Sequence, residues 1–369
     1  MKTLSTLLLI VTIALFVLLP ATALGQDTHA TAASLQSAAT SLASLPDADV
    51  LIYVSPQRIL SEAAPKFMPA SELAKMRSQF EEMKKGVGVD PSTIEYLVIA
   101  LRFHKPAGDL SFTGPDIMAV AGGDFSADSL FTLAQLYLQD KGRTEKHGSK
   151  TIAVMKVDPI AAQAEKTPML KSLVEMGLVP LSANSIAVGN LAYLHSAIDA
   201  SEGTGRINPA TLQSLLRDPN VLVAATGAPL SSLAKAFGLY GTETTPRDSR
   251  CETTFGNFYS AITINGDNIS LRGAMNADNP DTAKIISGLL AGLLQQTINS
   301  VPDKQAQTIL QSIKLTPQEN EIVWQADVPD KAIADMLAPK PAASISVVKP
   351  AAVKTTTPRR PIRKKRSRP

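Results

Sequence analysis

The chain has 369 residues, with 36 Lys and Arg against 33 Asp and Glu and a formal net charge of +3. Cys251 is the only cysteine, so an intramolecular disulfide is excluded and the core must be large enough without one. Aromatic residues make up 5% of the sequence and include one tryptophan, which argues against aromatic platforms for sugars or single-stranded nucleic acid.

Residues 1–25 have the layout of a secretory signal peptide. Lys2 precedes an apolar run from Leu4 to Leu19, and small residues follow the run. The run has 16 residues, fewer than the about 20 of a membrane-spanning helix. We therefore expect cleavage near Ala23 or Gly25 and a periplasmic or extracellular mature protein, with an uncleaved amino-terminal membrane anchor as the alternative.

The charge of the chain is unevenly distributed. Between Lys340 and Pro369 there are ten Lys and Arg and no acidic residue. Removing those ten leaves 26 basic against 33 acidic residues, a body of net charge −7, or −8 once Lys2 leaves with the signal peptide. The 340–369 segment is rich in Pro, Ala, Lys and Arg and has no aromatics, so we expect a disordered basic tail.

The end of this tail would pass for a nuclear-localisation signal, but the export signal argues against that role. On an exported protein, the tail is expected to contact an anionic envelope polymer or lipid headgroups. The alternative is a solvated tail that folds back on the acidic body. Nucleic acid is not expected as a partner. The expected contact residues are Arg359, Arg360, Arg363, Lys364, Lys365, Arg366 and Arg368.

Between these ends, residues 26–46 are small and polar and indicate a linker or loose helix. Strand and helix patterns then alternate along the first half, residues 47–217. The clearest helix has Leu73, Met76, Phe80 and Met83 at spacings of three and four. The predicted elements are strand 50–54, helix 71–85, strands 93–103 and 116–121, helix 127–139, strand 151–157, helix 160–176, strand 185–189 and helix 191–200.

The pattern begins again at Asp218, where "DPNVLVAATGAPLSSL" resembles "DADVLIYVSPQRIL" from Asp47, at an offset of 171 residues. The second half, residues 218–339, is predicted to contain strand 221–226, helix 229–238, strands 254–264 and 268–275, helix 281–298, strands 312–316 and 321–326, and helix 330–338. Asn265-Gly266 between two alternating strands indicates a hairpin. The predicted fold is α+β, with duplicated β-α-β-β-α-β-β-α halves, mixed or antiparallel sheets, and helices packed on the sheets.

No set of residues predicts a catalytic, cofactor-binding or metal site. The four histidines, His29, His104, His147 and His195, are scattered and lack the spacing of zinc ligands. Ser232 and Lys235 match the Ser-x-x-Lys of penicillin-recognising enzymes, but the companion motifs are out of order or missing, so the match is interpreted as coincidence. Cys251 has no nearby histidine to activate it and is expected to be inert.

Two further patterns are interpreted as structural. Pairs of aspartates follow three strands, and helix capping explains them better than acid–base chemistry or calcium binding. These pairs are Asp124/Asp128, Asp278/Asp281 and Asp327/Asp330. Gly288 and Gly292 lie in the apolar run 285–294, where we expect them to let a helix approach the sheet closely.

The segments "EKHGSKTIAVMKV", "KGVGVDPSTIEYLVIAL" and "LVPLSANSIAVGNLAYLHSAIDASEGTGRINPATLQSLLRDPNVLVAATGAPLSSL" resemble an uncharacterised family of exported bacterial proteins. These proteins carry a domain of unknown function with repeated strand-helix units. The resemblance spans residues 45–240 and rests on short motifs: a strand ending in Val-Gly, a helix with Ala-Ile-Asp, and a Gly-rich turn. It implies export and a repeated α+β body, and it supplies no catalytic residues.

These observations predict an exported, non-catalytic binding or envelope-associated protein of unknown ligand, without a cofactor. The alternative is an envelope hydrolase whose serine or carboxylates come together only in the tertiary fold.

Overall fold

The computed structural model describes residues 38–68, 70–87, 90–103, 115–138, 142–156, 174–218, 220–227, 256–301 and 304–337. Contacts divide the chain into two units, residues 1–337 and 338–369, so the two expected halves do not form separate compact bodies. The expected tail and the helices predicted at 160–176 and 229–238 lie largely or wholly outside the described residues.

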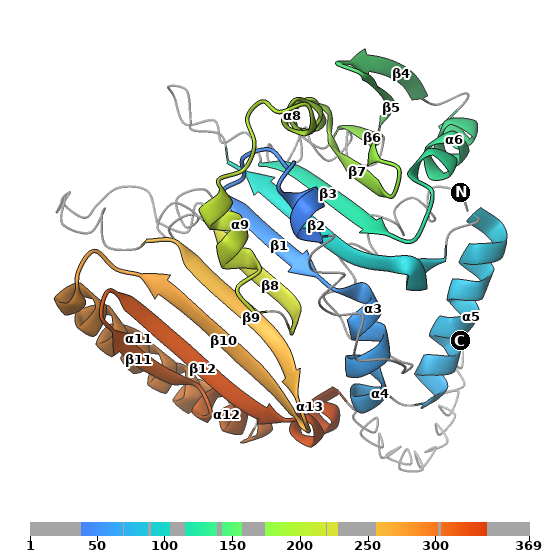
Figure 1. Ribbon diagram of the computed structural model, residues 1–369. Coiled ribbons are helices and arrows are strands. Elements are labelled where there is room, and N and C mark those ends of the chain that lie inside the picture. Colours follow the sequence, from blue (N-terminus) through green and yellow to red (C-terminus); the bar gives the residue numbers. More distant parts are fainter. Residues whose placement is uncertain are drawn as a thin grey trace, which may run out of the picture. The chain divides into compact units, whose positions relative to one another are not determined.

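All the strands of the described chain form one antiparallel sheet of twelve strands (Figure 1). Its order is β11-β12-β10-β9-β8-β1-β2-β3-β7-β6-β5-β4. The expectation of mixed or antiparallel sheets therefore resolves to a single antiparallel one. The strands are β1 Val50–Val54, β2 Ile94–Arg102, β3 Asp116–Gly123, β4 Gly142–His147, β5 Lys150–Lys156, β6 Glu175–Ser182, β7 Ser185–Asn190, β8 Val221–Gly227, β9 Phe258–Asn265, β10 Asn268–Asn276, β11 Lys314–Gln318 and β12 Glu321–Pro329.

Helices connect the strands at several points along the chain. They are α3 Pro56–Arg58, the π-helix η1 Ile59–Ala63, α4 Ala64–Phe67, α5 Ala70–Val87, the 3-10 helix η2 Pro91–Thr93, α6 Ala127–Leu138, α8 Leu191–Ser201, α9 Pro209–Leu215, α11 Pro280–Ser300, α12 Lys304–Gln311 and α13 Asp330–Leu337. Within α5, Met76 is buried and the other members of the predicted apolar stripe are partly buried, as their spacing indicated.

The sequence predicted most of the longer elements but missed eight: the short helices α3, η1, α4 and η2, together with β4, β6, α9 and α12. β6 was missed because the helix predicted at 160–176 overlaps its first two residues, Glu175 and Met176. The predicted end of that helix is therefore at least two residues too far along the chain. β4, α9 and α12 had no predicted counterpart. In the segment 26–46, expected to be a linker or loose helix, residues 38–42 are helical and Ala38, Leu42 and Leu45 are buried in the core.

The hairpin predicted at Asn265-Gly266 is confirmed. Asn265 and Asn268 pair as the last and first residues of β9 and β10, and Gly266 takes a positive φ of 60°. Only glycine adopts this left-handed conformation at no steric cost, which is why the turn needs this residue.

The two hydrophobic clusters lie on opposite faces of the sheet. Leu51, Val98 and Met118 belong to the larger cluster, which also takes in residues of α8 and α9. In the smaller cluster, Phe258, Met275 and Ile322 stand directly opposite one another on β9, β10 and β12. Tyr259, the residue after Phe258, belongs to the larger cluster. Because side chains alternate along a strand, the smaller cluster faces the other way.

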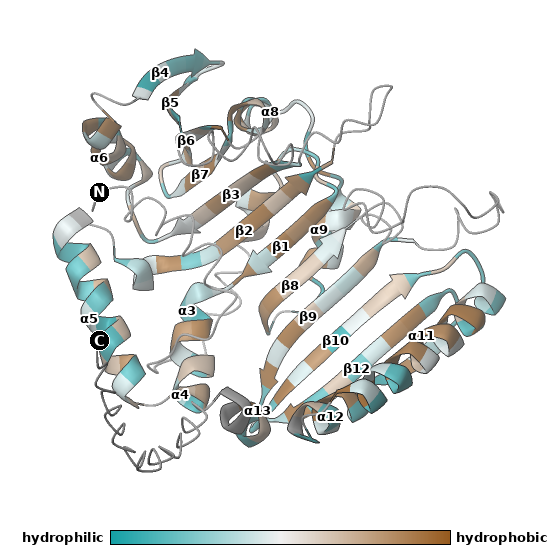
Figure 2. Cartoon of the chain, turned by 180° about the vertical axis from the view of Figure 1, so that it is seen from behind, coloured by the Kyte–Doolittle hydropathy of each residue, from teal (hydrophilic) through white to brown (hydrophobic). Residues whose placement is uncertain are grey.

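The helices are divided between the same two faces of the sheet. Figure 1 shows α9 in front of β8 and β1, and α11 behind β10 and β12. The reverse view in Figure 2 places α11 and α12 nearest the reader. Helix α11 packs through Ala283, Ile286 and Leu290 on the smaller cluster, so it covers only one end of the sheet.

Two glycines in the sheet make room for aromatic rings on the neighbouring strand. Gly122 of β3 pairs with Tyr96 of β2, and Gly273 of β10 pairs with Trp324 of β12. A Cβ at Gly273 would lie 2.1 Å from the indole of Trp324, and one at Gly122 would lie 2.2 Å from the ring of Tyr96. The rings therefore lie across the glycines, an arrangement that pins the register of the strands.

Replacing Gly273 by Val is expected to lower the free energy of unfolding by about 1–3 kcal/mol, because the indole of Trp324 has to move out of the space that the new side chain takes. Thermal unfolding of the purified protein measures this change. Gly86→Ala, at an exposed helix position with no atom within 4 Å, serves as the control and is expected to raise the stability slightly. An unchanged melting temperature for Gly273→Val would contradict the packing described.

Candidate functional site

Most of the candidate residues named from the sequence lie outside the described residues. These are His29, His104, Ser232, Lys235, Cys251 and the seven basic tail residues Arg359, Arg360, Arg363, Lys364, Lys365, Arg366 and Arg368. His147 and His195 are described, and the structure brings them together.

The rings of His147 and His195 stack on each other. Their centroids are 4.2 Å apart and the rings are inclined by 8°. His147 ends strand β4, and His195 lies in helix α8, which crosses β6 and β7 beside the β4–β5 hairpin (Figure 1). The two histidines are 48 positions apart in the sequence and are neighbours in the fold.

Each histidine also faces a carboxylate. His147 Nε2 lies 2.8 Å from Asp199 Oδ1 and is hydrogen-bonded to it. His195 Nε2 lies 2.8 Å from Glu145 Oε1, but the direction of approach does not meet hydrogen-bond geometry, so we describe this contact as electrostatic. Glu145 thus contacts His195, and His147 contacts Asp199. The first members of these pairs are two positions apart on a strand, and the second members are one helical turn apart.

Further charges hold the hairpin in place. Glu202 accepts a hydrogen bond of 2.8 Å from the backbone N–H of Ser149, in the turn of the hairpin. This bond lowers the pKa of the Glu202 carboxyl below its usual value. Arg143 donates to Glu145 at 2.5 Å, and that bond lowers the pKa of Glu145. We name the residues Arg143, Glu145, His147, His195, Asp199 and Glu202 the histidine cluster.

The histidine cluster joins the edge of the sheet to α8. The Nε2 atoms of both histidines face carboxylates. Among the residues that the structure describes, no group of three or more His, Cys, Asp and Glu could hold a metal ion. The arrangement attaches the hairpin to the helix.

A second polar cluster is buried at the ends of β2, β3 and β7. The carboxylate of Asp116 is almost fully buried and accepts hydrogen bonds from Arg102, the shorter at 2.7 Å, and from Asn190. Asn190 Oδ1 accepts from the backbone N–H of Ile117 at 2.7 Å. The guanidinium of Arg102 also lies 4.5 Å from the ring centroid of Tyr193.

This cluster satisfies its own charges, which is what a buried ion pair requires for stability. Tyr193 donates from its hydroxyl to the backbone oxygen of Asp47 at 3.0 Å, and burial raises the pKa of this phenol. The cluster therefore fixes α8 and the start of β1 to the sheet. No sequence pattern indicated this cluster, because its members are spread over more than 140 positions.

The aspartate pairs named from the sequence do not converge. Ser126 and Asn279 cap helices α6 and α11 through their side-chain oxygens, where Asp124 and Asp278 had been expected to act. Asp327 lies within β12 and accepts a hydrogen bond from Ser270. Asp128, Asp281 and Asp330 do lie in the first turns of their helices, where negative charge favours the helix dipole.

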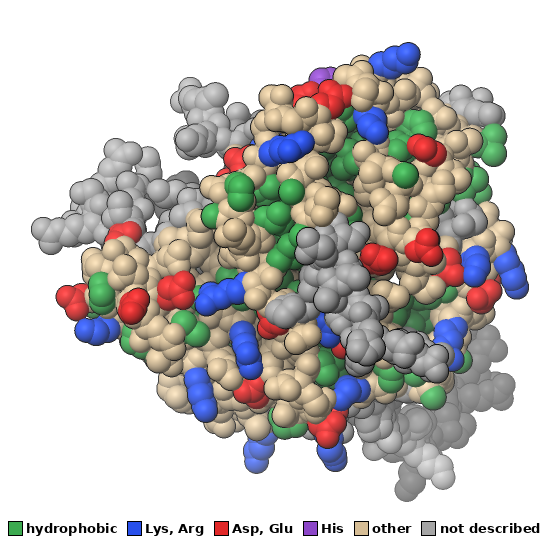
Figure 3. Space-filling view, viewed as in Figure 1, with side chains coloured by type: hydrophobic (Ala, Val, Ile, Leu, Met, Phe, Trp, Pro, Cys, Tyr) green, Lys and Arg blue, Asp and Glu red, His purple; other side chains and the backbone are tan. Residues whose placement is uncertain are grey.

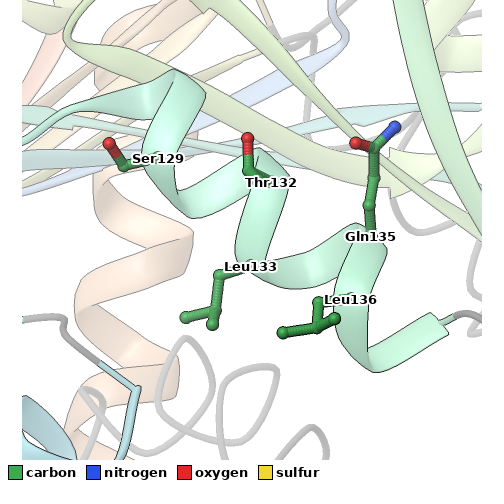
Figure 4. Close-up of a pocket in the computed structure, with 5 residues that line it drawn as sticks. All are labelled: Ser129, Thr132, Leu133, Gln135 and Leu136. Carbon is green, nitrogen blue, oxygen red and sulfur yellow. The ribbon is translucent and has the colours of Figure 1, made fainter.

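A hollow on the described surface lies along α6 (Figure 4). Its volume of about 640 Å³ is in the range of small-molecule pockets. The described residues that line it, however, all come from this one helix. They are Ser129, Thr132, Leu133, Gln135 and Leu136. Polar groups do not converge on it from several elements, so it lacks the form of a binding or catalytic pocket.

Apolar side chains are exposed on two helices. Leu136 and Tyr137 of α6 are 59% and 58% exposed. On α11, the exposed residues Ile285, Leu289 and Leu293 recur every fourth position. Gly288 and Gly292 lie on the same side and meet no atom within 4 Å, so the expectation that they let the helix approach the sheet was wrong. The glycines face outward because Ala283 and Ile286 make the contact with the sheet.

None of the helices in the described part of the chain is long and apolar enough to span a membrane. The apolar run at residues 4–19 lies outside that part.

No protein-family model matches this chain, and no curated protein is significantly similar to it in sequence. Solved structures that are similar to this chain include those of TP0453 in its crystal forms I, III and IV. Each is 9% identical in sequence and covers 80–81% of this chain and 95–96% of its own, with TM-scores of 0.39–0.40.

Glu202→Gln is expected to lower the stability of the protein at neutral pH, because the amide oxygen is a weaker acceptor than the carboxylate for the Ser149 N–H. The pKa of Glu202 is lowered by folding, so its contribution is present above the usual pKa of a glutamate and is lost as the pH falls through the lowered value. Melting temperatures measured between neutral and acidic pH should therefore converge for the two proteins at low pH. Glu82→Gln, on the exposed side of α5, is the control, and a pH-independent gap for Glu202→Gln would speak against the proposed bond.

Proposed function

We propose that the protein is exported and acts in the cell envelope as a non-catalytic binding protein, whose basic tail contacts an anionic polymer or lipid headgroups. The observation that carries this proposal is the separation of charge along the chain. Ten Lys and Arg lie in residues 340–369 without an acidic residue, whereas the rest of the chain has a net charge of −7.

This separation gives the two parts opposite responses to an anionic surface. A Lys or Arg near such a surface contributes about 1 kcal/mol of attraction, so several of them together hold a chain to it. The acidic body is repelled by the same surface. Acidic and basic side chains are interspersed on the face of the body in Figure 3, so the tail is the segment with a concentrated charge.

Export is supported by the sequence of residues 1–25, with its basic start, apolar run and small residues before the expected cleavage site. Export also favours an envelope polymer or lipid over nucleic acid as the partner of the tail.

We further propose that the body arose by duplication, with β1 and β8 as the equivalent first strands. Support comes from the order of strands counted outward from the β1–β8 pair. One direction reads β2, β3, β7, β6 and the other β9, β10, β12, β11. Helices α6 and α11 follow the second strand of each series, β3 and β10, and α8 and α13 follow the third, β7 and β12.

Full-length mature protein is expected to sediment with vesicles that contain anionic phospholipid, and with an anionic envelope polymer, in a manner that weakens as salt is added. A protein that ends before Lys340 is expected to stay in the supernatant. Replacing the seven basic residues 359, 360, 363, 364, 365, 366 and 368 by Gln should have the same effect, since it removes seven of the ten positive charges.

A tail with the same residues in scrambled order is the matched control and should bind as well as the natural tail, because the attraction depends on charge and not on order. Equal retention of the truncated protein would show that the tail is not the contact. If the tail folds back on the body instead, full-length protein would stay in the supernatant at low salt.

A further inference from the structure

The exposed side of α11 has the features of a protein contact surface. Ile285, Leu289 and Leu293 are 74%, 60% and 51% exposed. Together with Gly288 and Gly292 they occupy positions i, i+3, i+4, i+7 and i+8, which form one continuous side of a helix. We name these five residues the α11 outer stripe.

The rest of the helix already has its apolar partner. Ala283, Ile286, Ser287 and Ile298 are buried, and Leu290 packs on the smaller hydrophobic cluster. Helix α11 is therefore apolar on two sides, of which the sheet covers one. A soluble helix exposes polar groups on the side away from its core, so an exposed apolar side indicates a further partner.

The charges near the stripe favour a protein surface over a lipid surface. No charged residue occurs from Ile285 to Ser300, and the nearest cations along the chain are Lys284 and Lys304. Helices that lie on membranes carry Lys and Arg beside their apolar side, together with Trp or Phe that anchor at the headgroups. The α11 outer stripe has a single cation beside it, Lys284, which pairs with Asp281, and no Trp or Phe. Its lack of charge also means that two copies of it can meet without repulsion.

We propose that the partner of the α11 outer stripe is the same stripe of a second copy of this protein, in an antiparallel arrangement. Three large side chains form ridges and two glycines form notches on the same surface, so the stripe is complementary to itself. A two-fold axis brings such a surface onto its own copy. The notches let the helices approach at the short end of the usual interaxial distance of about 8–10 Å.

The antiparallel direction follows from the ends of the helix. Asp281 and Lys284 pair at 3.5 Å at its amino-terminal end, where their exposed side chains carry the only charges of α11. In an antiparallel contact, the Asp281–Lys284 pairs of the two copies lie at opposite ends of the interface. Each pair then lies beside the uncharged carboxy-terminal end of the other copy's α11. Leu289 is the middle residue of the stripe, so its two copies meet at the axis.

The size of the stripe sets the strength of the contact. Ile285 to Leu293 spans about 12 Å along the helix, at 1.5 Å per residue. Stable dimers bury about 800 Å² per partner, and three side chains and two glycines supply less than that. The dimer should therefore be weak and form as the protein becomes concentrated. This proposal does not depend on the tail or on export.

Sedimentation velocity of the full-length mature protein over a wide range of concentrations tests it. The wild type is expected to shift from monomer to dimer as the concentration rises. Leu289→Arg should weaken the dimer about tenfold or more, which corresponds to about 1.4 kcal/mol. Leu136→Arg is the matched control, because this leucine of α6 is 59% exposed against 60% for Leu289 but lies off the stripe. It should dimerise as the wild type does.

Opposite charges at the axis give a second measurement. Leu289→Asp and Leu289→Lys should each be monomeric, and their mixture should form a heterodimer. Circular dichroism checks that each variant is folded, which the exposure of Leu289 favours. The proposal fails if the wild type stays monomeric throughout, if Leu136→Arg reduces association as much as Leu289→Arg, or if the mixed variants remain monomeric. Retention of the wild-type monomer, but not of Leu289→Arg, on neutral phosphatidylcholine vesicles would assign the stripe to a lipid surface instead.

Discussion

The pairing of β1 with β8 holds the two halves of the sheet in one structure. Val50 to Val54 stand opposite Val223 to Gly227 in an unbroken antiparallel register, and four of the five residues of β1 are buried. β1 also pairs with β2 on its other side, so its backbone bonds are fully used. Without β8, the edge of β1 would be an apolar strand with unpaired amide and carbonyl groups, which is a site of aggregation.

The continuous sheet decides where each helix can lie. The larger hydrophobic cluster is covered by the helix of residues 38–42, by α8 and by α9. The buried cluster around Asp116 fixes α8 in place at one end. The smaller cluster lies on the opposite face and is covered by α11. Because the smaller cluster reaches only one side of α11, the apolar stripe on the other side stays exposed. The proposed contact between two copies is a consequence of this division of the core between two faces.

Local patterns in the sequence were enough to find the strands with apolar runs. Strand β1 was placed to the residue. Asn265-Gly266 marked the hairpin between β9 and β10, because this type of turn requires such residues. β4 was missed because Gly142–His147 is a polar edge strand, which needs no apolar side. Helix α9 carried a readable signal, an Asn208 cap followed by Pro209, but its short length hid it.

Long-range contacts could be predicted much less well. The histidine cluster joins a strand to a helix 50 or more positions away. Only two sequence offsets could have suggested it: two positions from Glu145 to His147 on the strand, and four positions from His195 to Asp199 on the helix. The orientation of α11 was predicted wrongly because an apolar pattern on two sides of a helix does not say which side meets the sheet. Only the packing of Ile286 against Met275 and Ile322 decides it.

Hydrogen exchange of the native, full-length protein in rising denaturant tests most directly whether the body is one sheet joined at β1 and β8. Amides of paired central strands are released only when the whole structure opens. The amides of β1 and β8 should therefore exchange together, with the same high free energy and the same dependence on denaturant as global unfolding. Exchange of β8, β9 and β10 at a lower free energy while β1, β2 and β3 stay protected would show that the halves unfold separately, and would contradict the central pairing.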